Sequence, residues 1–146
     1  MVKKILAAID GSEGAGRALE LAAGMAAEAH ASLWIVNVIG NFGFSPDELE
    51  QFRRTEGGSI VDVLESLSGQ WLNEAREKAA LLGATDIHLV SHTGDVAEAI
   101  IGAARDCSAG VIVVGRRGRG LMRELMLGSV SQKLASVSPR PVLIVP

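Results

Sequence analysis

The sequence has little sulfur and few aromatic residues. It contains one cysteine, Cys107, no tyrosine, two tryptophans and three phenylalanines among 146 residues. A single cysteine excludes an internal disulfide framework and any CxxC metal or redox pair, and it is typical of the reducing cytoplasm. Because aromatic residues are scarce, we expect a core of Ala, Val, Leu and Ile, and the 48% hydrophobic content indicates a compact globular protein.

Strong net charge and long apolar segments are absent as well. The formal net charge is −3, so neither nucleic acid nor an anionic membrane is an expected partner, because neither is attracted to a mildly acidic surface. The first apolar run, residues 5–9, is too short for a signal peptide, and no run approaches the roughly 18 apolar residues of a membrane span. The sequence therefore predicts a soluble, cytoplasmic protein with a single domain, residues 1–146.

Metal-binding and catalytic patterns are also missing. His30, His88 and His92 do not have the spacing of HExxH or of another known ligand set. Cys107 shares a predicted helix face with apolar residues, which favours a packed thiol over a reactive one. No nucleophile can be matched to a general base with an orienting partner, so we expect no dedicated catalytic centre and at most slow hydrolysis of a bound nucleotide.

Short apolar runs without clean alternation predict strands that are covered on both faces of a sheet. These runs are residues 4–9, 32–39, 86–91, 110–115 and 141–146. The last run, PVLIVP, is bracketed by prolines, which cannot donate to a strand ladder and therefore suit a strand near a sheet edge.

Helical patterns fill the gaps between these runs. They cover residues 13–29, residues 45–82 with a break at 57–58, a segment after Asp95, and a segment that begins at Ser129. Capping-box spacing starts the second helix at Ser45 and the fourth at Ser129. Strand and helix alternate from end to end, which predicts an α/β fold with a doubly wound parallel sheet and helices on both faces.

The predicted sheet places unusual residues where such folds bind ligands, beyond the carboxyl ends of the strands and commonly between the first and fourth strands. Asp10 follows the first strand, and Gly115 ends the fourth. A carboxylate there can accept hydrogen bonds from ribose hydroxyls, and a glycine lets a bulky ligand approach the backbone. The alternative is that Asp10 and Ser12 only cap the first helix.

A second group of residues predicts a phosphate cradle. Ser129 opens the fourth helix, so the amides that follow, beginning with Val130, have no helical acceptor and lie at the positive end of the helix dipole. Gly118 and Gly128 leave room for an anion to approach. The local positive charge comes from Arg116, Arg117, Arg119 and Arg123. The alternative is a set of ordinary glycine turns and solvated or salt-bridged arginines.

Common nucleotide-binding motifs do not account for this stretch. GxxxxGK[ST] and GxGxxG are both absent, which excludes the usual ATPase and dehydrogenase motifs. The spacing of Gly115, Gly118, Gly128 and Ser129 instead matches in full the ATP-binding signature G-x2-G-x9-G-[S/T] of the universal stress protein family, which the chain resembles. The resemblance also includes the opening KKILAAIDGSEGAGRALELA, the run LWIVNVI and the closing LMLGSVSQKLASVSPRPVLIVP.

The resemblance implies a Rossmann-like sheet with strand order 3-2-1-4-5 and a bound ATP that brings Mg²⁺ with it. Asp10 would hold the ribose hydroxyls, Val38 would offer its backbone to the adenine edge, and Gly115 would lie against the ribose. The residues around the phosphates would be Arg116, Gly118, Gly128, Ser129 and Val130, with Mg²⁺ near the serine hydroxyl. Family members often have a small or polar residue before the basic one, so Arg116 and Arg117 either attract phosphate or fold over the site.

The family also implies a homodimer through the last strand, residues 141–145, and a stress-response or signalling module read by an unidentified protein partner. Two alternatives stay open. One is a slow ATPase or a nucleotidyl-transferring enzyme on the same fold, and the other is a dimeric interaction protein whose nucleotide site is unoccupied. Residues 40–58 are the least constrained part of the sequence, and we expect a lid beside the nucleotide there.

Overall fold

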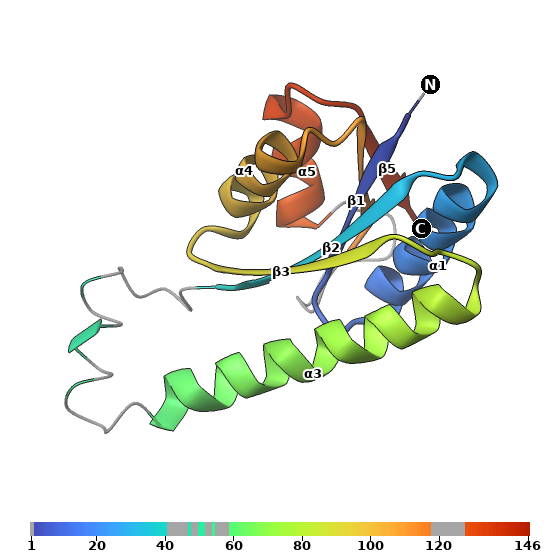
Figure 1. Cartoon of the computed structure of the whole chain (residues 1–146). Coiled ribbons are helices and arrows are strands. Elements are labelled where there is room, and N and C mark those ends of the chain that lie inside the picture. Colours follow the sequence, from blue (N-terminus) through green and yellow to red (C-terminus); the bar gives the residue numbers. More distant parts are fainter. Residues whose placement is uncertain (1, 41–46, 48–49, 52–53, 55–58, 118–127) are drawn as a thin grey trace.

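Five parallel strands form the central sheet in the computed structural model (Figure 1). They are β1 (Lys4–Ile9), β2 (Ser32–Ile39), β3 (Ile87–Thr93), β4 (Val111–Gly115) and β5 (Val142–Val145). The spatial order is β3-β2-β1-β4-β5, which confirms the predicted order and makes β5 an edge strand. The structure describes residues 2–40, 47, 50, 51, 54, 59–117 and 128–146.

Helices cover both faces of the sheet, as the alternating pattern predicts. They are α1 (Glu13–Ala29), α3 (Ser59–Leu81), α4 (Val96–Cys107) and α5 (Ser129–Val137). Helices α1 and α3 pack on one face and α4 and α5 on the other, below and above the sheet in Figure 1. The chain thus reverses its winding between β1 and β4, and this reversal positions the site.

Small side chains let the helices approach the sheet closely. The face of α1 that meets the sheet is mostly alanine, and Ala18, Ala22 and Ala23 are fully buried beneath it. The opposite core contains Leu6, Ile100 and Cys107, so Cys107 is the packed thiol that the helix pattern predicts. Burial raises the pKa of the Cys107 thiol, which keeps it protonated and unreactive near neutral pH.

Two boundaries differ from the sequence prediction. β3 runs from Ile87 to Thr93, past the expected end at residue 91, because it pairs with β2 as far as Ile39. The helix expected over residues 45–82 is represented by α3, while the predicted cap at Ser45 and the break at residues 57–58 lie outside the described residues. Among the helices of the described residues, none combines the length and the apolar content that a membrane span needs.

Candidate functional site

A cavity of about 240 Å³ opens at the carboxyl ends of the strands, where the winding reverses. Its wall includes residues that follow or end β1, β2 and β4, together with the first turns of α4 and α5. Of the residues predicted from the sequence, the cavity brings together Asp10, Val38, Gly115, Gly128, Ser129 and Val130. Gly118 lies outside the described residues.

One side of the cavity is apolar. Val36 and Val38 come from β2, Val114 from β4, and Val96 and Ile100 from α4. β2 pairs with β1 only as far as Asn37, so Val38 lies just past the end of β1. Sequence reasoning identified Val38 but not the two α4 residues, because nothing in the sequence indicates which helix face closes over the strand ends. This wall fits a flat, weakly polar ring.

Asp10 accepts a hydrogen bond in the turn before α1 and also lines the cavity. The Ser12 amide donates to Asp10 Oδ1 at 2.9 Å, and Ser12 Oγ accepts from the Ala15 amide at 3.2 Å as the N-cap of α1. The capping alternative is therefore present in the structure. Asp10 also lines the cavity, and a carboxylate can accept hydrogen bonds from several donors.

Gly115 is required by packing, in addition to any contact with a ligand. A Cβ at Gly115 would lie 2.8 Å from the Gly14 carbonyl carbon and 2.9 Å from its oxygen. The first turn of α1 therefore rests directly on the end of β4, and no larger residue fits between them. This contact holds the Asp10 turn next to β4.

The start of α5 differs from the prediction. Gly128, with φ −68° and ψ 163°, is the N-cap and Ser129 is the first helical residue, so the expected capping role of Ser129 is wrong. Because glycine has no side chain, no side-chain hydrogen bond caps this helix, and its first turn contains no acidic residue. The amides of Ser129, Val130 and Ser131 have no helical acceptor, and all three residues line the cavity.

The backbone of Arg116 joins the start of α5 to the sheet. Its amide donates to the Val145 carbonyl at 2.7 Å, and its carbonyl accepts from the Gly128 amide at 2.8 Å and from Ser131 Oγ at 2.6 Å. Ser131 was missed by the sequence analysis, which considered only its amide. Arg117 is among the residues that line this cavity, whereas Arg116 is not.

Asn37 is a second residue that the sequence analysis missed. It is buried, and its side-chain amide donates to the Ile9 carbonyl at 2.8 Å. This hydrogen bond occupies the last carbonyl of β1, directly before Asp10. A polar residue in an otherwise apolar strand is the signal that identifies such a position.

Nothing in the described residues forms a protein-based metal centre: no group of three or more His, Cys, Asp or Glu side chains is close enough to hold an ion. His88 pairs with Asp86 at 2.8 Å and stacks on Trp34 with ring centroids 4.2 Å apart. None of His88, Asp86 and Trp34 lines the cavity, which agrees with a structural role for this histidine.

Comparison with known proteins gives a consistent result. The sequence model described as the universal stress protein family matches residues 1–146. The chain is 34% identical to the universal stress protein YxiE of Bacillus subtilis, over 99% of each chain.

Solved structures agree with the sequence match. The universal stress protein UspA of Lactobacillus plantarum superimposes with a TM-score of 0.85 at 18% identity, over 99% of this chain and 97% of that one. A universal stress protein solved in complex with cAMP has a TM-score of 0.70 at 27% identity, over 99% and 96% of the two chains. The chain therefore belongs to the universal stress protein family.

Proposed function

We propose that this protein binds Mg-ATP in the cavity at the carboxyl ends of β1, β2 and β4 and acts as a nucleotide-dependent stress-response module. In this proposal Asp10 receives the ribose hydroxyls, the backbone of Val38 meets the adenine edge, and Gly115 lies beside the ribose. The phosphates are surrounded by Gly118, Gly128, Ser129 and Val130.

One observation carries the proposal: an apolar wall and an uncapped helix start lie in the same cavity. The valines of β2, β4 and α4 offer apolar contact to a base, and the free amides of α5 offer donors to an anion. An adenine nucleotide has a flat, weakly polar base at one end and anionic phosphates at the other. The cAMP complex of a family member supports this choice of ligand class.

The charge around the cavity favours the phosphate end. Arg117 lines the cavity beside the start of α5, and no acidic residue occupies the first turn of that helix. In a protein with a net charge of −3, this is a local positive field. Asp10 lies at the other part of the wall, next to β1, where a neutral ribose would not be repelled.

The donor set fits a Mg²⁺ that is held by the nucleotide. Mg²⁺ prefers oxygen ligands and commonly binds substrate phosphates with only one or two protein groups. The exposed Ser129 at the start of α5 carries a hydroxyl that fits this role. When bound, the ion supplies charge neutralisation for the phosphates.

The proposal includes a cytoplasmic homodimer formed through β5. The four residues of β5 are half-buried and lie at the edge of the sheet, where unpaired backbone groups are available to a second strand. The Val145 carbonyl on β5 accepts from the Arg116 amide. The edge strand is therefore hydrogen-bonded to the start of the signature segment, which is the stretch of chain from Gly115 to Ser129. A ligand that favours one arrangement of this segment would thereby change the surface that a protein partner reads.

The first experiment is to denature freshly purified protein and identify any released small molecule by chromatography and mass. The second is calorimetric titration with Mg-ATP of the wild type, Gly128→Val and Gly24→Val. A Cβ at Gly24 would have no atom within 4 Å outside its own stretch of helix, so valine at this position is a matched control for adding the same side chain.

We expect Gly128→Val to lose ATP binding by about a hundredfold or more, because the side chain occupies the position of the phosphates. The Gly24→Val variant should bind like the wild type. Unchanged affinity in a folded Gly128→Val variant would refute the site. If no adenine nucleotide binds the wild type or raises its melting temperature at millimolar concentration, the interaction-protein alternative replaces the proposal.

A further inference from the structure

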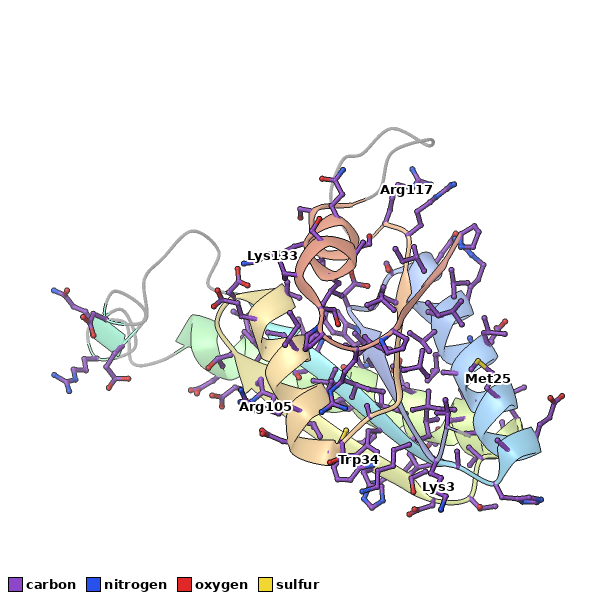
Figure 2. The ribbon with its side chains drawn as sticks, turned by 90° about the horizontal axis from the view of Figure 1, so that it is seen from above. Lys3, Met25, Trp34, Arg105, Arg117 and Lys133 are labelled. Carbon is purple, nitrogen blue, oxygen red and sulfur yellow. The ribbon has the colours of Figure 1, made fainter. Side chains whose placement is uncertain are left out.

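A second cavity, of about 210 Å³, adjoins the first and is mostly polar. We call it the arginine cavity, because Arg17, Arg116 and Arg117 line it. Ser12 and Arg117 line both cavities, so the two lie next to each other. Figure 2 shows Arg117 where β4 ends, at the same end of the molecule as the start of α5.

Basic residues outnumber acidic ones in the described lining of the arginine cavity. Three arginines from two distant segments of the chain line it, and Glu13 is the one acidic side chain among the described lining residues. Among the described residues, the ion pairs do not include Arg17 or Arg116. Positive groups that lie close together repel one another, and water screens this repulsion less at the half-buried Arg116 and Arg117 than at the exposed Arg17. A bound anion would remove this repulsion.

The side chain of Arg116 also has an unused donor. Its Nε atom is buried and has no hydrogen-bond partner in the described part of the chain. A buried donor without an acceptor costs free energy, so such groups are normally satisfied by the protein, water or a ligand. Guanidinium groups are especially suited to phosphate oxygens, because their planar donors match the oxygen geometry.

Arg17 is held in place by the end of the sheet. Its Nε donates to the Pro146 carbonyl at 2.8 Å. A Cβ at Gly14 would lie 3.7 Å from Arg17 Nη2 and 2.9 Å from the Arg117 carbonyl oxygen. The Arg17 guanidinium and the Arg117 backbone thus both lie close to the buried Gly14, where a side chain would clash with the Arg117 carbonyl.

We infer that the arginine cavity is a subsite for the distal phosphoryl group of a nucleotide whose adenosine lies in the first cavity. This inference rests on the proposed function. The shared Ser12 and Arg117 favour a phosphate of the same molecule over a separate anion, because a chain of phosphates that passes Arg117 enters the arginine cavity directly. The site therefore distinguishes nucleotides by the number of their phosphates.

The test is calorimetric titration with AMP, ADP and ATP of the wild type, Arg17→Gln, Arg116→Gln and Arg105→Gln. Arg105 is an exposed arginine on α4 that pairs only with its neighbour Asp106, and Figure 2 shows it far from Arg117. Thermal unfolding without nucleotide checks that each variant is folded. Arg17→Gln and Arg116→Gln each remove one guanidinium group, but only Arg17→Gln also removes the hydrogen bond to the Pro146 carbonyl. Comparing the two variants therefore separates these effects.

We expect either cavity variant to weaken ATP binding roughly tenfold, the effect of losing one charge-assisted hydrogen bond. AMP binding should change less than twofold, and Arg105→Gln should leave both affinities unchanged. Equal weakening of AMP and ATP, or no weakening of either, would overturn the inference. If the wild type binds no adenine nucleotide, the proposed function fails; if it binds AMP and ATP equally, only the subsite fails.

A further titration uses inorganic tripolyphosphate, with and without saturating AMP. If ATP binds no better than AMP while tripolyphosphate binds together with AMP and requires Arg17, the cavity takes a separate anion and the inference is wrong. Competition between tripolyphosphate and ATP that is lost in Arg116→Gln supports it.

Discussion

Helices α4 and α5 lie on the same face of the sheet and both line the candidate site, but their first turns are built differently. α4 begins with Asp95, whose side chain accepts from the Glu98 amide at 3.0 Å. Lys133 of α5, labelled in Figure 2, pairs with Asp95 at 3.2 Å and with Glu98 at 3.6 Å. α5 begins with Gly128 and has neither a side-chain cap nor an acid in its first turn.

Under the proposed function, this difference separates stability from binding at the carboxyl end of the sheet. At the start of α4 the Asp95 carboxylate accepts from the Glu98 amide, and Lys133 pairs with the carboxylates of Asp95 and Glu98. The protein itself thus supplies partners for this helix start. The start of α5 leaves its amides and its share of the helix dipole for an external anion. The cost in helix stability is small, about a few tenths of a kcal/mol, because glycine is itself a tolerated N-cap residue.

The largest expected effect comes from giving α5 the start of α4. Gly128→Asp places a carboxylate over the free amides, so we expect ATP affinity to fall by about a hundredfold through occupation of the donors and repulsion of phosphate. The nucleotide-free protein should become more stable to thermal unfolding. Gly128→Ser, which caps without charge, separates the two causes and should lose less affinity. An aspartate variant that binds ATP like the wild type would contradict the comparison.

A smaller effect is expected from removing the cap of α4. Asp95→Ala should lower the free energy of unfolding by about 1 kcal/mol, because the Glu98 amide loses its acceptor. Nucleotide affinity should stay within twofold of the wild type, since Asp95 does not line the cavity. Urea unfolding and calorimetry measure the two quantities. Loss of affinity without loss of stability would mean that the two helix starts do not have separate roles.

The smallest expected effect is a pH dependence of stability that comes from the charges of Asp95 and Lys133 at the start of α4. The hydrogen bond from the Glu98 amide, together with Lys133, lowers the pKa of Asp95, and the hydrogen bond to Asp95 raises the pKa of Lys133. The stability from Asp95 is therefore present above its unfolded pKa and lost as the pH falls through the lower folded value. That from Lys133 is present below its unfolded pKa and lost as the pH rises through the higher folded value.

Asp95→Asn tests this dependence because asparagine also caps helices. We expect the wild type to exceed the variant in stability by a constant, small amount between roughly pH 5 and pH 9, with the difference beginning to fall below about pH 4 and above about pH 10.5 and vanishing only beyond the shifted folded pKa values. Thermal unfolding across this range measures it. A difference that persists at low pH would assign the stabilisation to something other than the Asp95 charge.

The sequence was sufficient to predict the elements that position the site. Parallel strands with apolar runs, and helices with one apolar face, depend on local patterns, so β1, β2 and β4 were placed correctly. Asp10 and Gly115 were identified because strand ends and their turns can be recognised from adjacent residues. Ser129 was assigned as a cap because its capping-box spacing is genuine, but it is the first helical residue, and the N-cap is Gly128, one residue earlier.

The rest of the site depends on residues that meet only after folding. Val96 and Ile100 close the apolar wall because α4 lies across the ends of β1 and β2, a placement that no local pattern specifies. Ser131 was missed because its hydroxyl bonds to the distant Arg116 carbonyl. The position of Gly118 and the predicted lid at 40–58 remain predictions, since these residues lie outside or largely outside the described part of the chain.

By itself the sequence determined the α/β fold, the family and a signature spaced for phosphate, because these follow from short-range periodicity and from residues close to one another in the chain. Only the tertiary structure decided which side chains share a cavity. It brought Arg17 of α1 into one cavity with Arg116 and Arg117, which follow β4, and it made Arg116 part of the lining of the second cavity and not of the first. The physical reason is that such contacts are set by how the crossover helices pack on the twisted sheet, which depends on the whole core.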